Sequence, residues 1–152
     1  MKPYTVAIEI ELPRDKVIEL FDNPENQFHW QNGLVDVTHL DGEPGQPGAT
    51  TRLTYVMGSH RIELTETVTV RNFPDSFEGR YEWSGGSNTL KNRFIVINQS
   101  KTLWESTCAY KMKSLPNKLM AFFMPGKFKE QNMKFLRNFK AFAETGVSVN
   151  GQ

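Results

Sequence analysis

The N-terminal part of the chain switches between two hydrophobic periods. Apolar and polar residues alternate over 4–12, a period of two that predicts a strand with one buried face. Apolar residues then recur at helical spacing after Pro13, a residue suited to the first turn of a helix. The segment Asn23-Pro-Glu25 adds a cap, a first-turn proline and a first-turn acid. These signals predict two short helices, the second of which ends at Gly33.

The middle of the chain alternates again and is divided by turn residues. The glycine- and proline-rich segment 41–48 predicts a loop, and further turn signals stand at 58–59, 72–75, 84–87 and 98–101. Alternating segments separated in this way predict an antiparallel meander of about six strands. The predicted strands cover residues 34–40, 51–57, 62–70, 77–83, 90–96 and 104–112.

The last part of the chain returns to a helical period. The helix begins at Pro116, is interrupted at Pro125-Gly126, and resumes with phenylalanines that stack on one face, Phe128, Phe135, Phe139 and Phe142. The apolar segment 120–124 either gates a cavity or touches a membrane, or it is a kink that lets the helix follow a curved sheet. We expect one domain over residues 1–146 and a frayed tail over 147–152.

Composition restricts the class of protein. A chain of 152 residues suits a single domain, and a net charge of +1 lacks the basic excess of a dedicated nucleic-acid-binding protein. A mean hydropathy of −0.50 leaves no room for a membrane-spanning segment. The single cysteine, Cys108, excludes a disulfide framework, and the chain starts without the apolar run of a signal peptide. A cytoplasmic location is therefore expected.

The near-neutral total hides a charge asymmetry. Residues 1–110 carry 10 Lys+Arg and 15 Asp+Glu, net −5, whereas residues 111–152 carry 8 and 2, net +6. The basic end is either an amphipathic helix that seeks an anionic partner or an ordinary terminal helix with its polar face in water. We favour the second interpretation, because solvated polar faces are the norm for packed helices.

Several segments resemble one fold family. They are 13–21, Asp22-Asn-Pro-Glu25 leading to Trp30, Pro47-Gly48, Thr102-Leu-Trp104, 125–128 and 138–144. Through them residues 2–145 resemble the helix-grip proteins of the SRPBCC superfamily, which includes START lipid-transfer domains, pollen-allergen-like proteins and polyketide cyclases, and in particular an uncharacterised bacterial subgroup. The resemblance implies an α+β fold in which a curved antiparallel sheet of about seven strands is followed by a long C-terminal helix. Two short helices follow the first strand in this fold, and a cavity lies between the sheet and the long helix.

One carboxylate falls on the apolar face of a predicted strand. Glu66 alternates in step with Ile62, Leu64, Val68 and Val70, which predicts that its side chain points inward. A carboxylate in an apolar cavity tends toward a raised pKa, and it suits a general acid or base, or a partner for a ligand hydroxyl. The alternatives are a β-bulge that turns the side chain outward, or burial as a structural pair with an arginine or a tyrosine.

A second polar residue and several aromatic residues share these predicted inner faces. Asn92 lies between Leu90 and Phe94, and its amide either binds a ligand or pairs with Glu66 or a tyrosine. Tyrosine and tryptophan combine a large apolar surface with a polar tip, so they suit a cavity wall; packed core is the alternative for each. The residues expected to bind a ligand are Trp30, Tyr55, Glu66, Tyr81, Trp83, Asn92, Phe94, Trp104, Cys108, Tyr110, Phe128, Phe135 and Phe139.

Motifs of other chemistries are not found in the sequence. His29, His39 and His60 stand on different predicted elements, at spacings that do not indicate a metal site. Cys108 is more typical of a small buried apolar residue than of a nucleophile. The glycines of 41–48 lack the following helix and the free N–H groups of a phosphate-binding loop. The sequence therefore predicts no catalytic motif, no metal and no cofactor.

Three functions are compatible with these features. The sequence favours binding or carrying of a hydrophobic small molecule, lipid-like or polyketide-like and aromatic, in an internal cavity. The second hypothesis is a polyketide cyclase-like or aromatase-like enzyme that uses Glu66, Asn92 and a tyrosine. The third is a protein-binding module, resembling the chaperone-activator branch of the superfamily, whose basic C-terminal face meets an acidic partner. Neither nucleic acid nor stable membrane insertion is expected.

Overall fold

The elements of the structure follow the predicted order. The computed structural model describes residues 2–113 and 125–150, so the predicted helix start at Pro116 and the apolar segment 120–124 lie outside the described residues. The elements are β1 (Tyr4–Ile10), α1 (Arg14–Asp22), the 3-10 helix η1 (Pro24–Asn26), α2 (Gln27–Trp30), β2 (Leu34–Asp41), β3 (Thr50–Met57), β4 (His60–Asn72), β5 (Ser76–Trp83), β6 (Gly86–Asn98), β7 (Lys101–Met112) and α4 (Pro125–Thr145).

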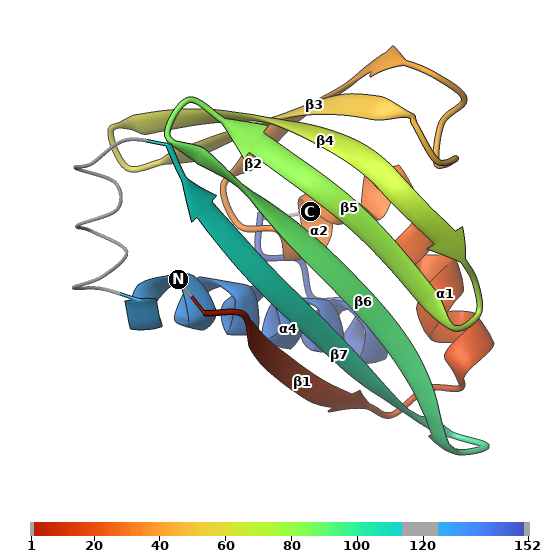
Figure 1. Cartoon of the computed structure of the whole chain (residues 1–152). Coiled ribbons are helices and arrows are strands. Elements are labelled where there is room, and N and C mark those ends of the chain that lie inside the picture. The colour runs from red at the N-terminus through yellow and green to blue at the C-terminus, as the bar shows by residue number, and fades with distance from the viewer. Residues whose placement is uncertain (1, 114–124, 151–152) are drawn as a thin grey trace.

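All described strands belong to one antiparallel sheet. Its order is β1-β7-β6-β5-β4-β3-β2, so β2 to β7 are neighbours in the order of the chain and β1 joins the edge at β7. The sheet curves around α4, which packs on β1 and α2 (Figure 1). The predicted α+β architecture is confirmed, with seven strands, short helices after the first strand and a long C-terminal helix.

A β-bulge in β4 changes one predicted face. The register passes from Val68 opposite Gly79 to Val70 opposite Glu78, so Thr69 is an extra residue on this strand. Because an extra residue inverts the alternation, Val70 does not share the face of Val68, and this part of the prediction is wrong. The bulge follows Glu66, so the alternation that contains the carboxylate is intact.

The core lies between the sheet, α1, α2 and α4, and it is largely aromatic. Phe21 on α1 contacts six rings at centroid distances of 5.1–6.4 Å, those of Trp30, Phe73, Phe77, Phe94, Trp104 and Phe139. Phe94 and Phe139 are 1% and 0% exposed, and most of these contacts are edge-to-face, an arrangement that the ring quadrupoles favour. This cluster joins both helical layers to the middle of the sheet.

Helix α4 has the amphipathic character that the sequence predicts. Phe139 is buried and Phe135 and Phe142 are half-buried, whereas Lys134 and Arg137 are exposed on the opposite side. An apolar stripe against the core with charges in water is the usual arrangement of a packed surface helix. Within the described residues, no helix has the length and apolar character required to cross a bilayer.

The C-terminal tail is attached to α2, contrary to the predicted frayed segment 147–152. The Val149 N–H donates to the carbonyl of His29 at 3.0 Å, and Asn150 Nδ2 donates to the carbonyls of Phe28 at 2.6 Å and Gln31 at 3.1 Å. A short helix such as α2 leaves carbonyl groups unpaired at its C-terminal end, and the tail satisfies them. This correction applies to the part of the tail that the structure describes, up to Asn150.

Replacing Phe139 with alanine removes a fully buried ring from the aromatic cluster. We expect Phe139→Ala to lower the free energy of unfolding by about 3–5 kcal/mol, because apolar contact is lost and a void is left. The exposed Val147 provides the control, since Val147→Ala should change stability by less than about 0.5 kcal/mol. Urea unfolding followed by tryptophan fluorescence measures both, and equal effects would contradict the assignment of the core.

Candidate functional site

A cavity of about 740 Å³ lies between the concave face of the sheet, α2 and α4. Its closed end is formed by rings of the aromatic cluster, including Phe21, Phe77 and Trp104. Exposed side chains such as His39 and Arg61 also line it, so the cavity communicates with solvent. The space is within the range of pockets that enclose drug-sized ligands, about 300–1,000 Å³.

Most of the residues predicted to bind a ligand lie on the wall of this cavity. The ten that line it are Trp30, Tyr55, Glu66, Tyr81, Trp83, Asn92, Trp104, Tyr110, Phe128 and Phe135. The alternating pattern of the strands is the reason for this agreement, because it determines which side chains face α4.

Three predicted residues do not line the cavity. Phe94 and Phe139 belong to the aromatic cluster, where α1 and α4 close on the sheet and leave no free space. Cys108 is 0% exposed, and Asn88 Nδ2 lies 3.5 Å from its sulfur. Burial raises the pKa of the Cys108 thiol, so this cysteine is a neutral buried group, and the structure places it behind the wall of the cavity.

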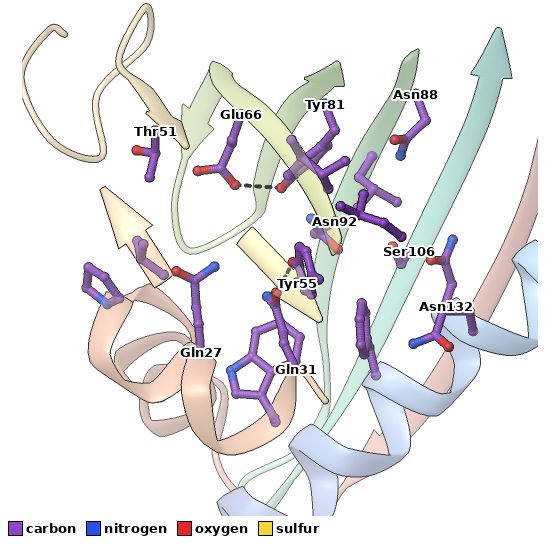
Figure 2. A pocket seen from close by; sticks show the side chains of 18 of the residues that line it. Gln27, Gln31, Thr51, Tyr55, Glu66, Tyr81, Asn88, Asn92, Ser106 and Asn132 are labelled. Atoms are coloured by element: carbon purple, nitrogen blue, oxygen red, sulfur yellow. Dashed lines mark hydrogen bonds between the residues drawn. The ribbon is translucent and has the colours of Figure 1, made fainter. Parts of the chain in front are cut away.

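Polar side chains form a continuous row across the concave face. Strand pairing places one such residue from each of β2 to β7 directly opposite the next, and all six line the cavity. We call this set the polar row; its members are His39, Thr51, Glu66, Tyr81, Asn88 and Tyr110. Apolar or glycine residues flank it on the neighbouring register lines, among them Leu53 paired with Leu64 and Val68 paired with Gly79. Four members are visible along the sheet in Figure 2.

Glu66 occupies the middle of the polar row and points into the cavity, as the alternation predicts (Figure 2). Its Oε2 accepts a hydrogen bond of 2.7 Å from the hydroxyl of Tyr81. Burial raises the pKa of Glu66, and the bond from Tyr81 opposes this effect in part because it stabilises the ionised form. Burial and the nearby carboxylate both raise the pKa of Tyr81, so the phenol remains protonated.

Tyr55 connects the sheet to the helical side of the cavity. Its hydroxyl donates to Gln31 Oε1 just after α2, and its ring lies 6.4 Å from that of Phe135 on α4. Burial raises the pKa of Tyr55, with a smaller contribution from the charge of Glu66. The sequence analysis did not select Gln31, since it follows a helix of four residues that is too short to show a periodic face.

Asn92 bonds to groups of the core, so of the alternatives considered for it the pairing with Glu66 or a tyrosine is not formed among the described residues. Its Oδ1 accepts from Trp104 Nε1 at 3.0 Å, and its Nδ2 donates to the carbonyl of Phe77 at 3.3 Å. The register explains the difference, because Asn92 pairs with Phe77 on β5 and is four residues along β6 from Asn88, the residue opposite Tyr81. Asn92 thus orients Trp104, and its side chain also lines the cavity.

A second polar group lies where the sheet meets the first turns of α4. Asn132 Nδ2 donates to the hydroxyl of Tyr4 at 2.6 Å, and the Tyr4 ring stacks on Tyr110 at 6.1 Å. Tyr110 also packs against Phe128 at 4.6 Å. The sequence analysis did not select Asn132. It lies four residues after Phe128 and three before Phe135, so helical spacing places it on the same face as these two rings.

The charged and sulfur-containing side chains were also considered as metal ligands. Over residues 2–113 and 125–150, no group of three histidine, cysteine, aspartate or glutamate side chains is close enough to hold an ion. His29 stacks on Phe142 at 4.8 Å and lies 3.1 Å from Ser148 Oγ, while His39 Nε2 lies 2.7 Å from the carbonyl oxygen of Gly42. The polar row itself therefore combines hydroxyl, amide and carboxyl groups with the imidazole of His39.

Solved structures share this architecture over nearly the whole chain. A conserved protein from Geobacillus kaustophilus superimposes with a TM-score of 0.77 at 14% identity, covering 93% of this chain and 95% of that one. The chain has the helix-grip fold. The Zhui aromatase/cyclase from a Streptomyces species (TM-score 0.74, 12% identity, 97% and 99% covered) has this fold too. Ginseng major latex-like protein 151 from Panax ginseng also has it (TM-score 0.74, 14% identity, 94% and 97% covered). No protein-family model and no curated protein sequence matches the chain.

Removing the hydroxyl of Tyr81 tests the environment of Glu66. We expect Tyr81→Phe to raise the pKa of Glu66 further, because the ionised carboxylate loses its hydrogen-bond donor. Titration of the Glu66 carboxyl carbon by NMR measures the shift. Tyr55→Phe removes a hydroxyl that bonds Gln31, so it should leave the Glu66 pKa nearly unchanged; a fall in that pKa in Tyr81→Phe would refute the assignment.

Replacing Glu66 with glutamine tests the cost of burying its charge. The folded-state pKa of Glu66 is raised above the unfolded value, so folded wild-type protein loses stability as the pH rises through that interval. Glutamine does not ionise, so the Glu66→Gln variant does not suffer this loss. The free energy of unfolding of the variant, relative to that of wild type, should therefore increase from acidic to alkaline pH. Thermal unfolding at a series of pH values measures the difference, and a difference that shrinks with rising pH would exclude a buried, unstabilised carboxylate.

Proposed function

We propose that the protein binds and carries a hydrophobic small molecule in the cavity between the sheet and α4. The observation that supports this proposal best is the cavity itself, which remains open although the neighbouring aromatic cluster is tightly packed. Protein interiors are normally close-packed, so a space of about 740 Å³ walled largely by aromatic and apolar side chains is typical of a ligand pocket. Burial of apolar ligand surface supplies the driving force for such binding.

The wall of the cavity suits a flat or elongated apolar ligand with few polar groups. Rings of Trp30, Tyr55, Trp83, Phe128 and Phe135 offer faces for stacking, and the polar row supplies hydrogen-bond partners at one level of the sheet. A lipid-like or polyketide-like aromatic molecule meets both conditions. The Zhui aromatase/cyclase has the same fold at 12% identity, and its name is compatible with the second of these classes.

A second candidate function is an enzyme of the cyclase or aromatase type, favoured by the Glu66–Tyr81 pair. A carboxyl group beside a phenol inside the cavity can donate a proton to a ligand carbonyl when it is protonated, and can take a proton from a neighbouring carbon when it is ionised. Asn92 lies opposite Phe77 on β5, away from the Glu66–Tyr81 pair, and its amide oxygen accepts from Trp104. We rank this function second, since the pair explains ligand binding equally well.

A protein partner and a cytoplasmic location are retained as lesser proposals. The exposed Lys127, Lys129, Lys134 and Arg137 on α4 give that helix a basic outer surface. This surface suits an acidic partner, but it is also what a solvated helix normally presents.

Filling the cavity tests the proposed binding. Native mass spectrometry of protein purified without detergent should detect a bound apolar molecule, and delipidated protein should bind the neutral probe N-phenyl-1-naphthylamine with increased fluorescence. Leu90→Trp places a large ring in the cavity and should weaken probe binding at least about tenfold, because an occupied volume excludes the ligand. The control is Thr89→Trp on the exposed face of the same strand. Equal affinity of both variants would show that the probe binds elsewhere.

A further inference from the structure

The charges on the cavity wall are paired, with one exception. Asp22 forms an ion pair of 2.6 Å with Arg71, and Arg61 lies 3.9 Å from Glu63. His39 Nε2 lies within hydrogen-bond distance of a backbone carbonyl. Glu66 alone among these charged wall residues has no cation within ion-pair distance on any described residue, and Tyr81 is its hydrogen-bond donor.

The hydroxyl protons of the two tyrosines near Glu66 already form hydrogen bonds within the protein. Tyr81 donates its proton to Glu66, and Tyr55 donates its proton to Gln31. A tyrosine hydroxyl has one proton, so both oxygens retain only lone pairs for a further partner. The oxygens of Glu66, Tyr55 and Tyr81 therefore remain as acceptors, and a ligand group that bonds to these oxygens must bring hydrogen-bond donors.

The position of Glu66 in the sheet confines the missing positive charge and the missing donors to one place on the cavity wall. Thr51 and Tyr81 flank it on the adjacent strands, and the register lines on either side are apolar. A ligand that lies along the cavity thus meets one anionic position between apolar surfaces. The rings of Tyr55 and Tyr81 stand near this position, and aromatic faces attract cations.

We propose that Glu66 anchors a protonated amine carried by an otherwise apolar ligand. An ammonium group supplies the missing positive charge and up to three donors, which Glu66 and the tyrosine oxygens can accept. A neutral hydroxyl supplies a donor but leaves the buried carboxylate without a counter-charge. The inference rests on the proposed binding function, since it names the class of molecule that the same cavity holds.

Burial of the carboxyl group agrees with this assignment. Desolvation raises the pKa of Glu66, which is the behaviour of an acid that lacks a cation. A bound ammonium reverses the effect, because the ion pair favours the charged form. Amine affinity should therefore fall as the pH is lowered through the Glu66 titration, whereas the affinity of an uncharged analogue should not.

Other titratable groups near the site must be separated from Glu66 in this experiment. Tyr55 faces it from β3 and Tyr81 from β5, and the burial of both phenols keeps them protonated. His39 lies two strands away in the polar row, and α2 contributes the uncharged Gln27 and Gln31 to the wall. A pH dependence that disappears in Glu66→Gln belongs to Glu66, whereas one that persists belongs to another group and counts against the proposal.

A matched pair of probes tests the proposal. 2-(2-Naphthyl)ethylamine and 2-(2-naphthyl)ethanol differ in the amine alone, and calorimetric titration at neutral pH gives both affinities. We expect wild-type protein to prefer the amine by about tenfold or more, a typical effect for a charged hydrogen bond. Glu66→Gln should abolish this preference and change alcohol binding less than about threefold. The control Glu82→Gln removes a carboxylate that pairs with Arg80 on the outer face, and it should keep the preference.

The outcomes separate this proposal from the one on which it rests. If both probes bind wild-type protein equally and Glu66→Gln alters neither, the cavity binds ligands but the amine assignment is wrong. If neither probe binds, the proposed binding function fails and the amine site fails with it. Should Glu66→Gln not fold, the pH dependence of amine binding to wild-type protein decides, and an affinity independent of pH overturns the proposal.

Discussion

The packing of six aromatic rings around Phe21 is the interaction on which the rest of this structure depends. The rings come from α2, the β4–β5 turn, β5, β6, β7 and α4, so a single cluster holds both helical layers against the sheet. Because this cluster is tightly packed, it stabilises the fold, and the part of the sheet that lines the cavity does not have to pack against α4. The curved sheet can therefore remain separated from α4 near β3 and β4, and the cavity occupies that space.

The polar row exists because the sheet keeps its register across six strands. Each member is one cross-strand step from the next, so residues far apart in the chain form a line at a single level of the cavity. A buried carboxyl in such a place lowers stability, and natural proteins tolerate this cost mainly at functional sites. The bond between Tyr81 and Glu66 reduces the cost without supplying a counter-charge.

Period-two alternation accounts for what could be predicted of the site. It identified the inner faces of the strands, and hence Tyr55, Glu66 and Tyr81, because parity alone decides which side of a strand a residue occupies. Parity carries no information on which residues of two strands lie opposite each other. For this reason the sequence left the partner of Asn92 open, and the alignment of Asn88 with Tyr81 was not foreseen.

The sequence by itself determined the order and type of the elements, the inner faces of the strands apart from β4 beyond its bulge, and the amphipathic side of the last helix, because these follow from local periodicity. The tertiary structure decided where aromatic residues pack and where they leave space. Phe94 and Phe139 carry the same sequence signal as Trp83 and Phe135, yet the first two lie in the core and the others line the cavity. It also decided that no cation of the described residues lies within ion-pair distance of Glu66, since that depends on the register of neighbouring strands and on the curvature of the sheet.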